Sequence, residues 1–403
     1  MRILFLTQVL PYPLDAGPKI RAYYVLRHLA HEHQITLVSF VRASDSAEAV
    51  AHLAGLCRDV HTVPMPRSRT QDAWFLAGSF MTETPFLVAR DKVPEMSRLI
   101  QRLVTTHHFD VVHADQLWMA PYALRARESA EREPPQLVLD QHNAVFQIPR
   151  RLAESEQNPA KRWLLDLEAR KLARYEREIC RRFDHVVWVT EEDRAAVGVD
   201  GVPSSVIPIC LDPEAQWPVG RRVEAQRVTF LGGLHWPPNA EGIVWFAREV
   251  WPSVRARVPR AVLTIIGKDP PAALRSVKAD GVEVTGYVTD PKPYLQETGA
   301  FIVPLHAGGG MRVKILDAWA WELPVVSTRI GAEGICVRDG ESALLADTRE
   351  AFADAVVRVL QNVNLAARLA TGGRRMIETD YNWRRVYGVW GEVYSAADTR
   401  ILV

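Results

Sequence analysis

Short apolar runs rich in valine and isoleucine alternate with longer amphipathic segments along the whole chain of 403 residues. In the first half the apolar runs predict strands at Ile3–Leu6, Ile35–Phe40, Val60–Val63, Asp110–His113, Leu137–Asp140, His185–Thr190 and Val206–Ile209. In the second half they predict strands at Val228–Gly232, Val262–Ile266, Val282–Val284, Phe301–Pro304, Val325–Ser327 and Ala343–Leu345. Strands separated by helical stretches are typical of βαβ units, and continuous apolar strands suit a sheet covered on both faces. The pattern therefore predicts an α/β fold with parallel sheets.

The pattern restarts near the middle of the chain. Residues 211–226 are polar, contain prolines and lack periodicity, as is typical of a linker. A strand followed by a glycine-containing turn comes on either side of this segment. We therefore expect two doubly wound, Rossmann-like domains that face a central cleft, with ligands at the carboxyl ends of the strands. The expected domains are 1–212 and 213–380, followed by a C-terminal helix in 381–403 that packs back toward the first domain.

Composition excludes several classes of protein. The net charge is +1, from 49 basic and 48 acidic residues, so nothing indicates a polyanionic partner such as nucleic acid. The four cysteines are scattered without CxxC spacing, which argues against a disulfide framework or a zinc site. The first apolar run is too short for a signal peptide, and no run reaches transmembrane length. We expect a cytoplasmic protein.

The segment Lys161–Arg182 predicts a helix with an apolar stripe and eight basic against four acidic residues. Such a helix is compatible with a weak peripheral contact with an anionic membrane surface, at the inner face of the membrane. The favoured interpretation is a solvated charged face on a helix that packs against the core.

The stretch from Leu305 to Val326 carries the strongest chemical signal. A strand, three glycines and a helix follow one another, and a proline then opens the next strand. If the helix begins near Gly310, then Gly310, Lys314 and Asp317 share one face. Bare amides and a cation suit a diphosphate, while a carboxylate suits ribose hydroxyls. The alternative is a simple glycine turn with a surface ion pair.

Two further loops combine a glycine, a helix start and polar side chains. Gly17 and Lys19 flank a helix that begins near Pro18, which is a second phosphate-friendly position together with Arg21. In the second half the corresponding residues are Gly233, His235 and Asn239. Either loop is equally typical of an ordinary helix start. No GxGxxG follows a strand, which weakens a nicotinamide or flavin hypothesis, and neither a nucleophile elbow nor HExxH occurs.

Two histidines lie at predicted strand ends in the first half. His113 precedes Asp115 by two residues, and His142 follows Asp140 by two. A histidine near a carboxylate serves as a general base or binds phosphate, although a histidine at a strand end is more often structural. We expect one of the two to be functional.

Together these features resemble the retaining, nucleotide-sugar-dependent glycosyltransferases of the GT-B fold, most closely glycosyltransferase family 4 and its branches in bacterial exopolysaccharide assembly. The residues that carry the resemblance are Arg2–Leu6, Pro11–Pro13 with Gly17, Asp110–His113, Phe230–Gly232, Trp236, Pro238–Asn239 and Gly309–Val326. Their order along nearly the whole chain is more specific than any one of them.

The chain departs from the pattern of that family at three places. The usual pair of glutamates eight positions apart is here Gly309 and Asp317. The position before Leu-Pro, commonly glycine, is Glu322. The basic pair that usually binds diphosphate is not evident around 232–239, and Arg312 and Lys314 are its expected substitutes.

The resemblance implies transfer of a sugar from a nucleotide-diphosphate donor to an acceptor hydroxyl, with retention of configuration. It places Gly309, Gly310, Arg312 and Lys314 on the phosphates and Asp317 on the ribose. The acceptor, a glycan, a lipid-linked saccharide or a small molecule, is expected near His113, Asp115 and His142. No metal and no cofactor beyond the nucleotide sugar is expected. The alternatives are a nucleotide-sugar 2-epimerase on the same fold and a catalytically inactive sugar-nucleotide-binding subunit.

Overall fold

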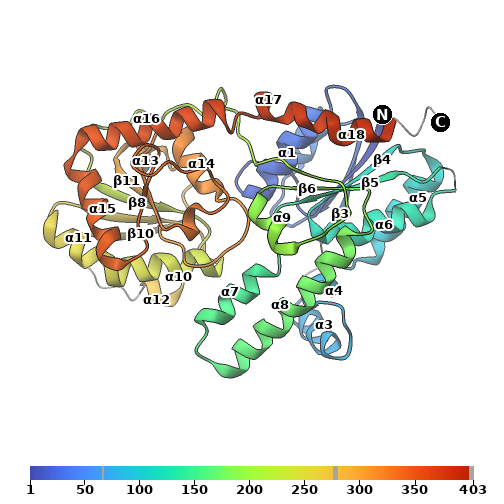
Figure 1. Ribbon diagram of the computed structural model, residues 1–403, viewed down its shortest axis with the longest axis horizontal. Coiled ribbons are helices and arrows are strands. Elements are labelled where there is room, and N and C mark those ends of the chain that lie inside the picture. The colour runs from blue at the N-terminus through green and yellow to red at the C-terminus, as the bar shows by residue number, and fades with distance from the viewer. Residues whose placement is uncertain (66–67, 132, 276–279, 399–403) are drawn as a thin grey trace. The chain divides into compact units, whose positions relative to one another are not determined.

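The computed structural model describes residues 1–65, 68–131, 133–275 and 280–398. The chain divides into two compact units (Figure 1). Unit 1 comprises residues 1–210 together with the C-terminal segment from residue 386, and unit 2 comprises residues 211–385.

Unit 1 contains a seven-stranded parallel sheet in the order β3-β2-β1-β4-β5-β6-β7. Its strands are β1 (Arg2–Thr7), β2 (Gln34–Val41), β3 (Asp59–Pro64), β4 (Val111–Asp115), β5 (Gln136–Gln141), β6 (His185–Trp188) and β7 (Ser204–Val206). Its helices are α1 (Gly17–Leu29), α2 (Ala47–Ala54), α3 (Arg69–Met81), α4 (Phe86–Ala89), α5 (Pro94–Thr106), η1 (Leu117–Met119), α6 (Ala120–Ser129), α7 (Gln147–Ser155), α8 (Pro159–Cys180), α9 (Glu191–Val197), η4 (Tyr387–Val389) and α18 (Trp390–Asp398).

Unit 2 contains a six-stranded parallel sheet in the order β10-β9-β8-β11-β12-β13. Its strands are β8 (Arg227–Leu231), β9 (Val262–Ile266), β10 (Val282–Gly286), β11 (Thr298–Val303), β12 (Val325–Ser327) and β13 (Leu344–Leu345). Its helices are α10 (Pro237–Trp245), η2 (Phe246–Val250), α11 (Trp251–Arg257), α12 (Ala272–Arg275), α13 (Lys292–Gln296), α14 (Val313–Ala320), η3 (Ile330–Ala332), α15 (Arg349–Gln361), α16 (Val363–Thr379) and α17 (Trp383–Val386), the last of which ends at the boundary of the unit.

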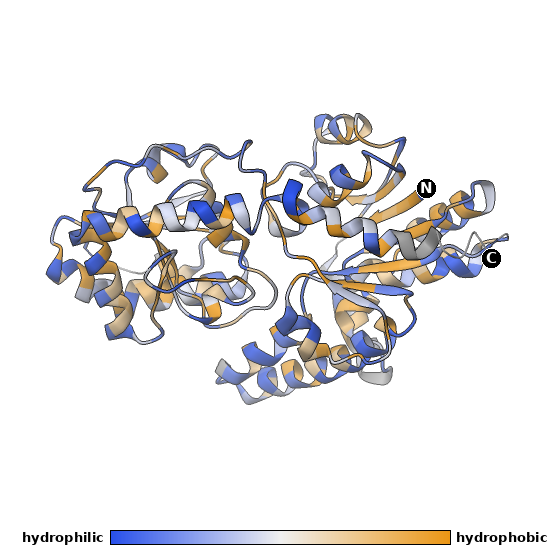
Figure 2. Cartoon of the chain, turned by 45° about the horizontal axis from the view of Figure 1, so that its top comes forward, coloured by the Kyte–Doolittle hydropathy of each residue, from blue (hydrophilic) through white to orange (hydrophobic). Residues whose placement is uncertain are grey.

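The predicted α/β class with two doubly wound parallel sheets is confirmed. Ile3, Leu4 and Phe5 of the central strand β1 are fully buried, as expected of a sheet covered on both faces. Figure 2 shows hydrophobic strands inside each unit and helices whose outer residues are hydrophilic. One predicted strand is misplaced. The apolar run Val206–Ile209 contributes a single residue to β7, which lies at the edge of the sheet and ends at Val206.

The strand order fixes where ligands are expected to bind. In each sheet the order reverses beside the first strand, between β1 and β4 in unit 1 and between β8 and β11 in unit 2. At such a switch point the loops that follow the two strands diverge and leave room for a ligand at the carboxyl edge. The loops after β1, β4, β8 and β11 are therefore the expected ligand-binding loops.

The charged segment predicted as a helix forms α8, which packs against α7 as a helical hairpin in unit 1 (Figure 1). Leu172 and Ile179 are buried, and the basic residues of α8 are exposed except Lys171, which is half-buried. Among the described helices, none combines the length and the apolar content that a membrane span needs.

Helix α14 begins at Val313, three residues later than the predicted start near Gly310. The helix ends beside Glu322, which stands at the position before Leu-Pro where the resembled family commonly has glycine. Glu322 has φ 59°, and the N–H of Leu323 bonds the carbonyl of Ala318, 2.9 Å away, beyond the last turn. This closing turn requires a left-handed residue, which glycine adopts with little strain.

We predict that Glu322→Gly raises the free energy of unfolding by about 1 kcal/mol, because it relieves the strain of a left-handed side-chain-bearing residue. Urea denaturation measures the change. Glu322→Ala removes the carboxylate but keeps the strain, so it is expected to give no such gain. Equal stabilisation by both substitutions would trace the effect to the charge of Glu322 instead.

Candidate functional site

A cluster of polar residues lies at the switch point of unit 2. Nζ of Lys314, in the first turn of α14, donates to Oδ1 of Asn239 at 2.5 Å. Nδ2 of Asn239 in turn donates to the carbonyl of Gly233 at 2.8 Å. These bonds join the segment after β11 to the loop after β8. Lys314, Asn239 and Gly233, which sequence reasoning assigned to donor binding, therefore lie together.

The two ionisable side chains of α14, Lys314 and Asp317, both have strongly shifted pKa values. Burial, assisted by the positive charge of Arg312, lowers the pKa of Lys314 to about 7. Burial likewise raises the pKa of Asp317, one turn further along α14, to about 7. Both groups therefore titrate near neutrality, and an anion bound at Lys314 would favour its charged form. Perturbed titratable groups of this kind are enriched at functional sites.

Close backbone approach explains the glycines at this edge. A Cβ on Gly232 would lie 3.0 Å from Nζ of Lys314, and a Cβ on Gly267 at the end of β9 would lie 2.1 Å from the carbonyl oxygen of Gly232. A Cβ on Gly233 would lie 2.7 Å from the ring of the exposed His235. The loop thus folds tightly around the ammonium group, with little room for a side chain at Gly232.

Arg312 has a different role from the predicted phosphate contact. Its Nη1 donates to the carbonyls of Gly309 at 2.6 Å and Gly310 at 3.0 Å, and its Nε donates to the carbonyl of Ile330 at 3.3 Å. The side chain is 7% exposed. Arg312 therefore holds the glycine loop in shape, including Gly310, whose φ is 70°. Gly309 and Gly310 belong to this loop and not to the helix, and their phosphate contacts stay predictions.

The loop after β1 in unit 1 gives less support to phosphate binding. Gly17 opens α1, and Lys19 in the first turn of this helix pairs with Asp15 of the preceding loop across 3.0 Å. Arg21, which the sequence placed beside this position, does not face it, because its side chain is fully buried.

Arg21 instead forms a buried fork with Asp140 at the carboxyl end of β5. Nε and Nη2 donate to the two carboxylate oxygens at 2.9 and 3.0 Å, and Nη1 donates to the carbonyl of Pro208 at 2.8 Å. Burial opposes ionisation of both groups. The charge of each partner outweighs it, so the pKa of Asp140 is lowered and that of Arg21 is raised. Tyr387 adds a hydroxyl 3.2 Å from Nη1.

His113 lies inside the fold rather than at its surface. The ring is fully buried, stacks on Phe5 with 4.1 Å between centroids, and shares a 2.6 Å hydrogen bond from Nδ1 to the hydroxyl of Tyr394 in α18. Burial lowers the pKa of His113 to about 3, so the ring is neutral at physiological pH. This corrects the expectation that His113 meets the acceptor directly, because nothing outside the fold reaches the ring.

His142 is the less deeply buried member of the pair. Its side chain is 9% exposed, and Nε2 lies 2.9 Å from Oδ1 of the buried Asp115 and 3.9 Å from Oδ2 of Asp140. Burial raises the pKa of Asp115, while the neighbouring His142 opposes that shift. The carboxylate therefore orients the imidazole, as the base-and-orienter arrangement of catalytic histidines requires. Asp115 lies behind His142 and acts through it.

Two buried carboxylates hold the loop that follows His142. Glu176 of α8 accepts hydrogen bonds from the N–H groups of Val145 and Phe146 at 2.8 and 2.9 Å. Asp193 accepts one from the N–H of Ala144 at 2.7 Å. Burial raises the pKa of Glu176 to about 8 against the effect of these donors. The sequence did not single out either residue, because both are distant from His142 along the chain. Glu176 lies within the charged sequence of α8, and Asp193 lies in the acidic first turn of α9.

The buried histidine and aspartates of unit 1 include residue types that can bind a metal ion. Among the residues that the structure describes, one group has ligand atoms within 4.8 Å of one another, and it consists of His113, Asp115 and Asp140. The guanidinium of Arg21 already occupies both oxygens of Asp140 and adds a positive charge beside the group. Because that charge opposes a cation, we assign no metal to this site.

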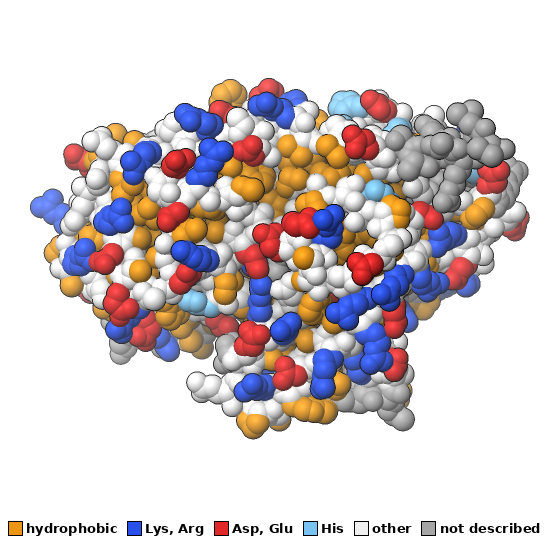
Figure 3. All heavy atoms as spheres, in the orientation of Figure 1, with side chains coloured by type: hydrophobic (Ala, Val, Ile, Leu, Met, Phe, Trp, Pro, Cys, Tyr) orange, Lys and Arg blue, Asp and Glu red, His pale blue; other side chains and the backbone are white. Residues whose placement is uncertain are grey.

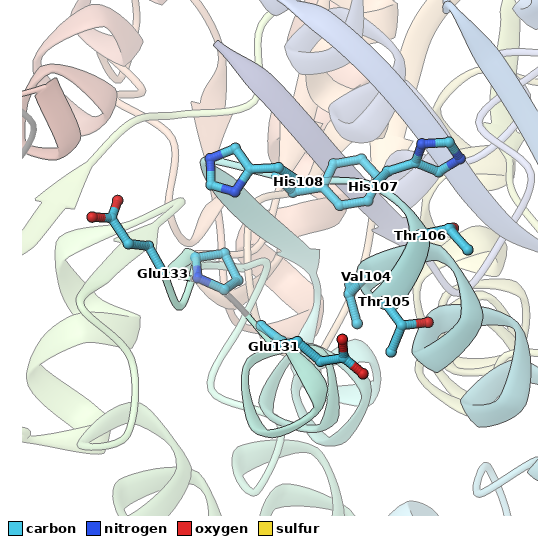
Figure 4. A pocket seen from close by; sticks show the side chains of 10 residues that line it. Val104, Thr105, Thr106, His107, His108, Glu131 and Glu133 are labelled. Carbon is cyan, nitrogen blue, oxygen red and sulfur yellow. The ribbon is translucent and has the colours of Figure 1, made fainter.

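A small pocket lies at the opposite edge of the unit 1 sheet (Figure 4). It is lined by residues that precede β4 and β5, including His107, His108, Glu131 and Glu133. Since ligands of doubly wound sheets bind beyond the carboxyl ends of the strands, this pocket is not the candidate site.

Comparison with known proteins agrees with this geometry. Residues 225–362 match the family model described as "Glycosyl transferases group 1". An uncharacterized 44.6 kDa protein in the cps region of Klebsiella pneumoniae is 22% identical over 96% of this chain and 98% of its own length. The lipopolysaccharide core biosynthesis glycosyltransferase LpsE of Rhizobium meliloti (strain 1021) is 32% identical over 24% of this chain and 28% of its own length.

Among solved structures, the crystal structure of Anabaena Alr3699/HepE in complex with UDP and glucose superposes with a TM-score of 0.68. The likeness covers 98% of this chain and 99% of that chain at 14% identity, which establishes a common fold. The family model covers the unit that carries Lys314 and its glycine loop. Unit 2 therefore carries a domain that matches the group 1 glycosyl transferases, and the chain as a whole shares the two-sheet fold of HepE.

Proposed function

We propose that the protein transfers a sugar from a nucleotide-diphosphate donor to an acceptor hydroxyl with retention of anomeric configuration. The observation that carries the proposal is the cluster at the switch point of unit 2, where Lys314 is held by Asn239 beside a glycine loop. Such a cluster offers a cation and backbone amides to an anion. HepE was solved with UDP and glucose, and LpsE is named for lipopolysaccharide core biosynthesis, which supports a nucleotide-sugar donor and a glycan product.

In this proposal Lys314 binds the diphosphate and Asp317 accepts hydrogen bonds from the ribose. A diphosphate beside Lys314 favours the ammonium form, so the cation is present when negative charge develops on the leaving group. Preorganised charge of this kind is usually the largest contribution to catalysis. In the proposal Gly309 and Gly310 contribute backbone N–H groups, and Arg312 maintains the shape of their loop.

On the acceptor side we assign the direct role to His142 and positioning roles to Asp115 and His113. In a retaining reaction at the front face of the sugar, the leaving diphosphate takes the proton of the acceptor hydroxyl. A histidine then mainly orients the acceptor. This role fits an imidazole that is itself oriented by Asp115.

The function is tested by a thermal-shift panel of UDP, GDP, dTDP and ADP, followed by incubation with the matching nucleotide sugar. Bound nucleotide raises the apparent stability by mass action. Transfer to an acceptor with retained configuration by NMR is expected. An epimerised donor without acceptor would identify a 2-epimerase instead, and binding without turnover would identify an inactive sugar-nucleotide-binding subunit. An inverted product would reject retention.

We predict that His142→Ala lowers kcat/KM for the acceptor by about tenfold, less than the 10²–10⁴-fold typical of a lost general base. Nucleotide affinity is expected to stay unchanged, because His142 belongs to unit 1. The control is His107→Ala, an exposed histidine at the opposite edge of the same sheet. If His142→Ala leaves acceptor kinetics at the level of the control, the assignment is wrong.

A further inference from the structure

A groove runs along the helical hairpin of unit 1. It has a volume of about 520 Å³, and its lining comes from α7 and α8 and the residue that precedes α7. The lining residues are Phe146, Arg150, Trp163, Asp166, Ala169, Arg170, Ala173 and Arg177. We propose that this groove binds an acidic saccharide chain, the acceptor of the transfer. This inference rests on the proposed function and names the class of its acceptor.

The groove is built from one face of each helix. On α8 the lining positions recur every three or four residues from Trp163 to Arg177, which places them on a single stripe. This stripe is about 21 Å long at 1.5 Å per residue. The matching positions on the other side are Arg150 of α7 and Phe146, which immediately precedes α7. A groove of this length suits an extended chain rather than a single small molecule.

The chemistry of the lining combines an apolar floor with cations. Phe146 and Ala169 are buried, and Trp163 is 56% exposed, so its indole offers an apolar face to a ligand. Three arginines oppose one acidic residue, Asp166. Arginine presents a planar fork of donors that matches carboxylate and phosphate groups. Sugar rings with acidic substituents satisfy both parts of the lining.

The arginines keep donors for such a ligand. Arg170 uses its Nε on the carbonyl of Asp166, 3.3 Å away, and Arg177 uses its Nε on the carbonyl of Val197, 2.9 Å away. Arg150 lies 3.8 Å from Glu154 in a pair in which both side chains are about two-thirds exposed. Such a pair contributes little and is readily exchanged for a ligand. A guanidinium has five donors, so these contacts leave others available.

One end of the groove leads to the candidate acceptor site. Phe146 lines the groove four residues after His142, and Glu176 of α8 fixes the N–H groups of Val145 and Phe146. Helix α8, which presents two of the three arginines, therefore also positions the loop that follows His142. A saccharide held along the hairpin would bring its end to this histidine.

A membrane surface fits the same charges less well. Figure 3 shows Lys and Arg side chains gathered over the region of α8. A flat bilayer would meet the outermost side chains, whereas Phe146 and Ala169 form a buried floor. The concave lining and its continuity with the loop of His142 favour an extended chain.

The test is calorimetric binding of hexagalacturonate, a linear acidic hexasaccharide, to the full chain without donor. We expect it to bind about tenfold more tightly than the neutral maltohexaose, and more weakly as salt is raised. Trp163→Ala and the double variant Arg150→Gln/Arg170→Gln should each weaken binding at least fivefold. The matched controls, Trp74→Ala for the exposed aromatic and Arg174→Gln for an arginine of α8 outside the groove, should not.

Equal affinity for both hexasaccharides, no binding, or unchanged binding in the groove variants would overturn the proposal. Binding to vesicles of equal parts phosphatidylglycerol and phosphatidylcholine that depends on Trp163 and Arg170, without hexagalacturonate binding, would replace the saccharide by a membrane. UDP binding to the same samples is measured separately. Loss of UDP binding with retained hexagalacturonate binding would therefore count against the donor site and not against the groove.

Discussion

Arg21→Met is expected to lower the free energy of unfolding by about 3–5 kcal/mol, the range measured when one partner of a buried ion pair is removed. Arg21 and Asp140 are both fully buried, and the guanidinium bonds both carboxylate oxygens. Methionine fills most of the volume but leaves Asp140 charged without its partner. Urea denaturation followed by circular dichroism measures the loss.

Two further variants separate the ion pair from a general sensitivity to arginine loss. Arg58→Met removes an exposed arginine that pairs with Asp59 at 3.6 Å, and it should cost less than about 1 kcal/mol. Adding Asp140→Leu to Arg21→Met removes the unpaired charge and should restore part of the stability. A loss at Arg21 no larger than that at Arg58 would mean that the buried pair does not stabilise the fold.

The strands were predictable because the physics behind them is local. A parallel strand buried on both faces appears in sequence as an unbroken apolar run, as at Ile3–Leu6. The strands of unit 2 show the same alternation of apolar runs and helical segments. The strand order then brings Gly233, Asn239 and Lys314 to one edge. Their joint position follows from the fold class, although the hydrogen bonds between them required the structure.

The interior of unit 1 was not predictable, because distant segments create it. His113 is buried by Tyr394, which follows it by 281 residues, and Arg21 finds its carboxylate 119 residues away. A histidine at a strand end and an arginine near a helix start carry no sign of such partners. The start of α14 was likewise misjudged, since the side chain of Arg312 bonds the carbonyls of Gly309 and Gly310 and keeps them out of the helix.

Lys314→Met is expected to weaken binding of the nucleotide diphosphate by about 1–3 kcal/mol, the scale of a lost charge-assisted hydrogen bond. Nζ of Lys314 lies 4.8 Å from the ring centroid of Phe230. Methionine keeps an unbranched apolar side chain against that ring, so the variant should fold while lacking the cation. Isothermal calorimetry with UDP or with the nucleotide selected by the thermal-shift panel measures the change. Lys292→Ala, an exposed lysine of the same unit, is the control.

The same lysine predicts how binding depends on pH. Because burial lowers the pKa of Lys314 to about 7, the free protein loses this cation as pH rises through 7. An anionic ligand favours the protonated form and raises this pKa, so binding should take up a proton and weaken above pH 7, by at most about tenfold per pH unit. Asp317 titrates in the same range, so the measurement is repeated in Asp317→Asn to isolate the lysine. If Asp317→Asn binds the nucleotide equally well at pH 6 and pH 8, or if Lys314→Met keeps full affinity, the diphosphate does not bind at Lys314.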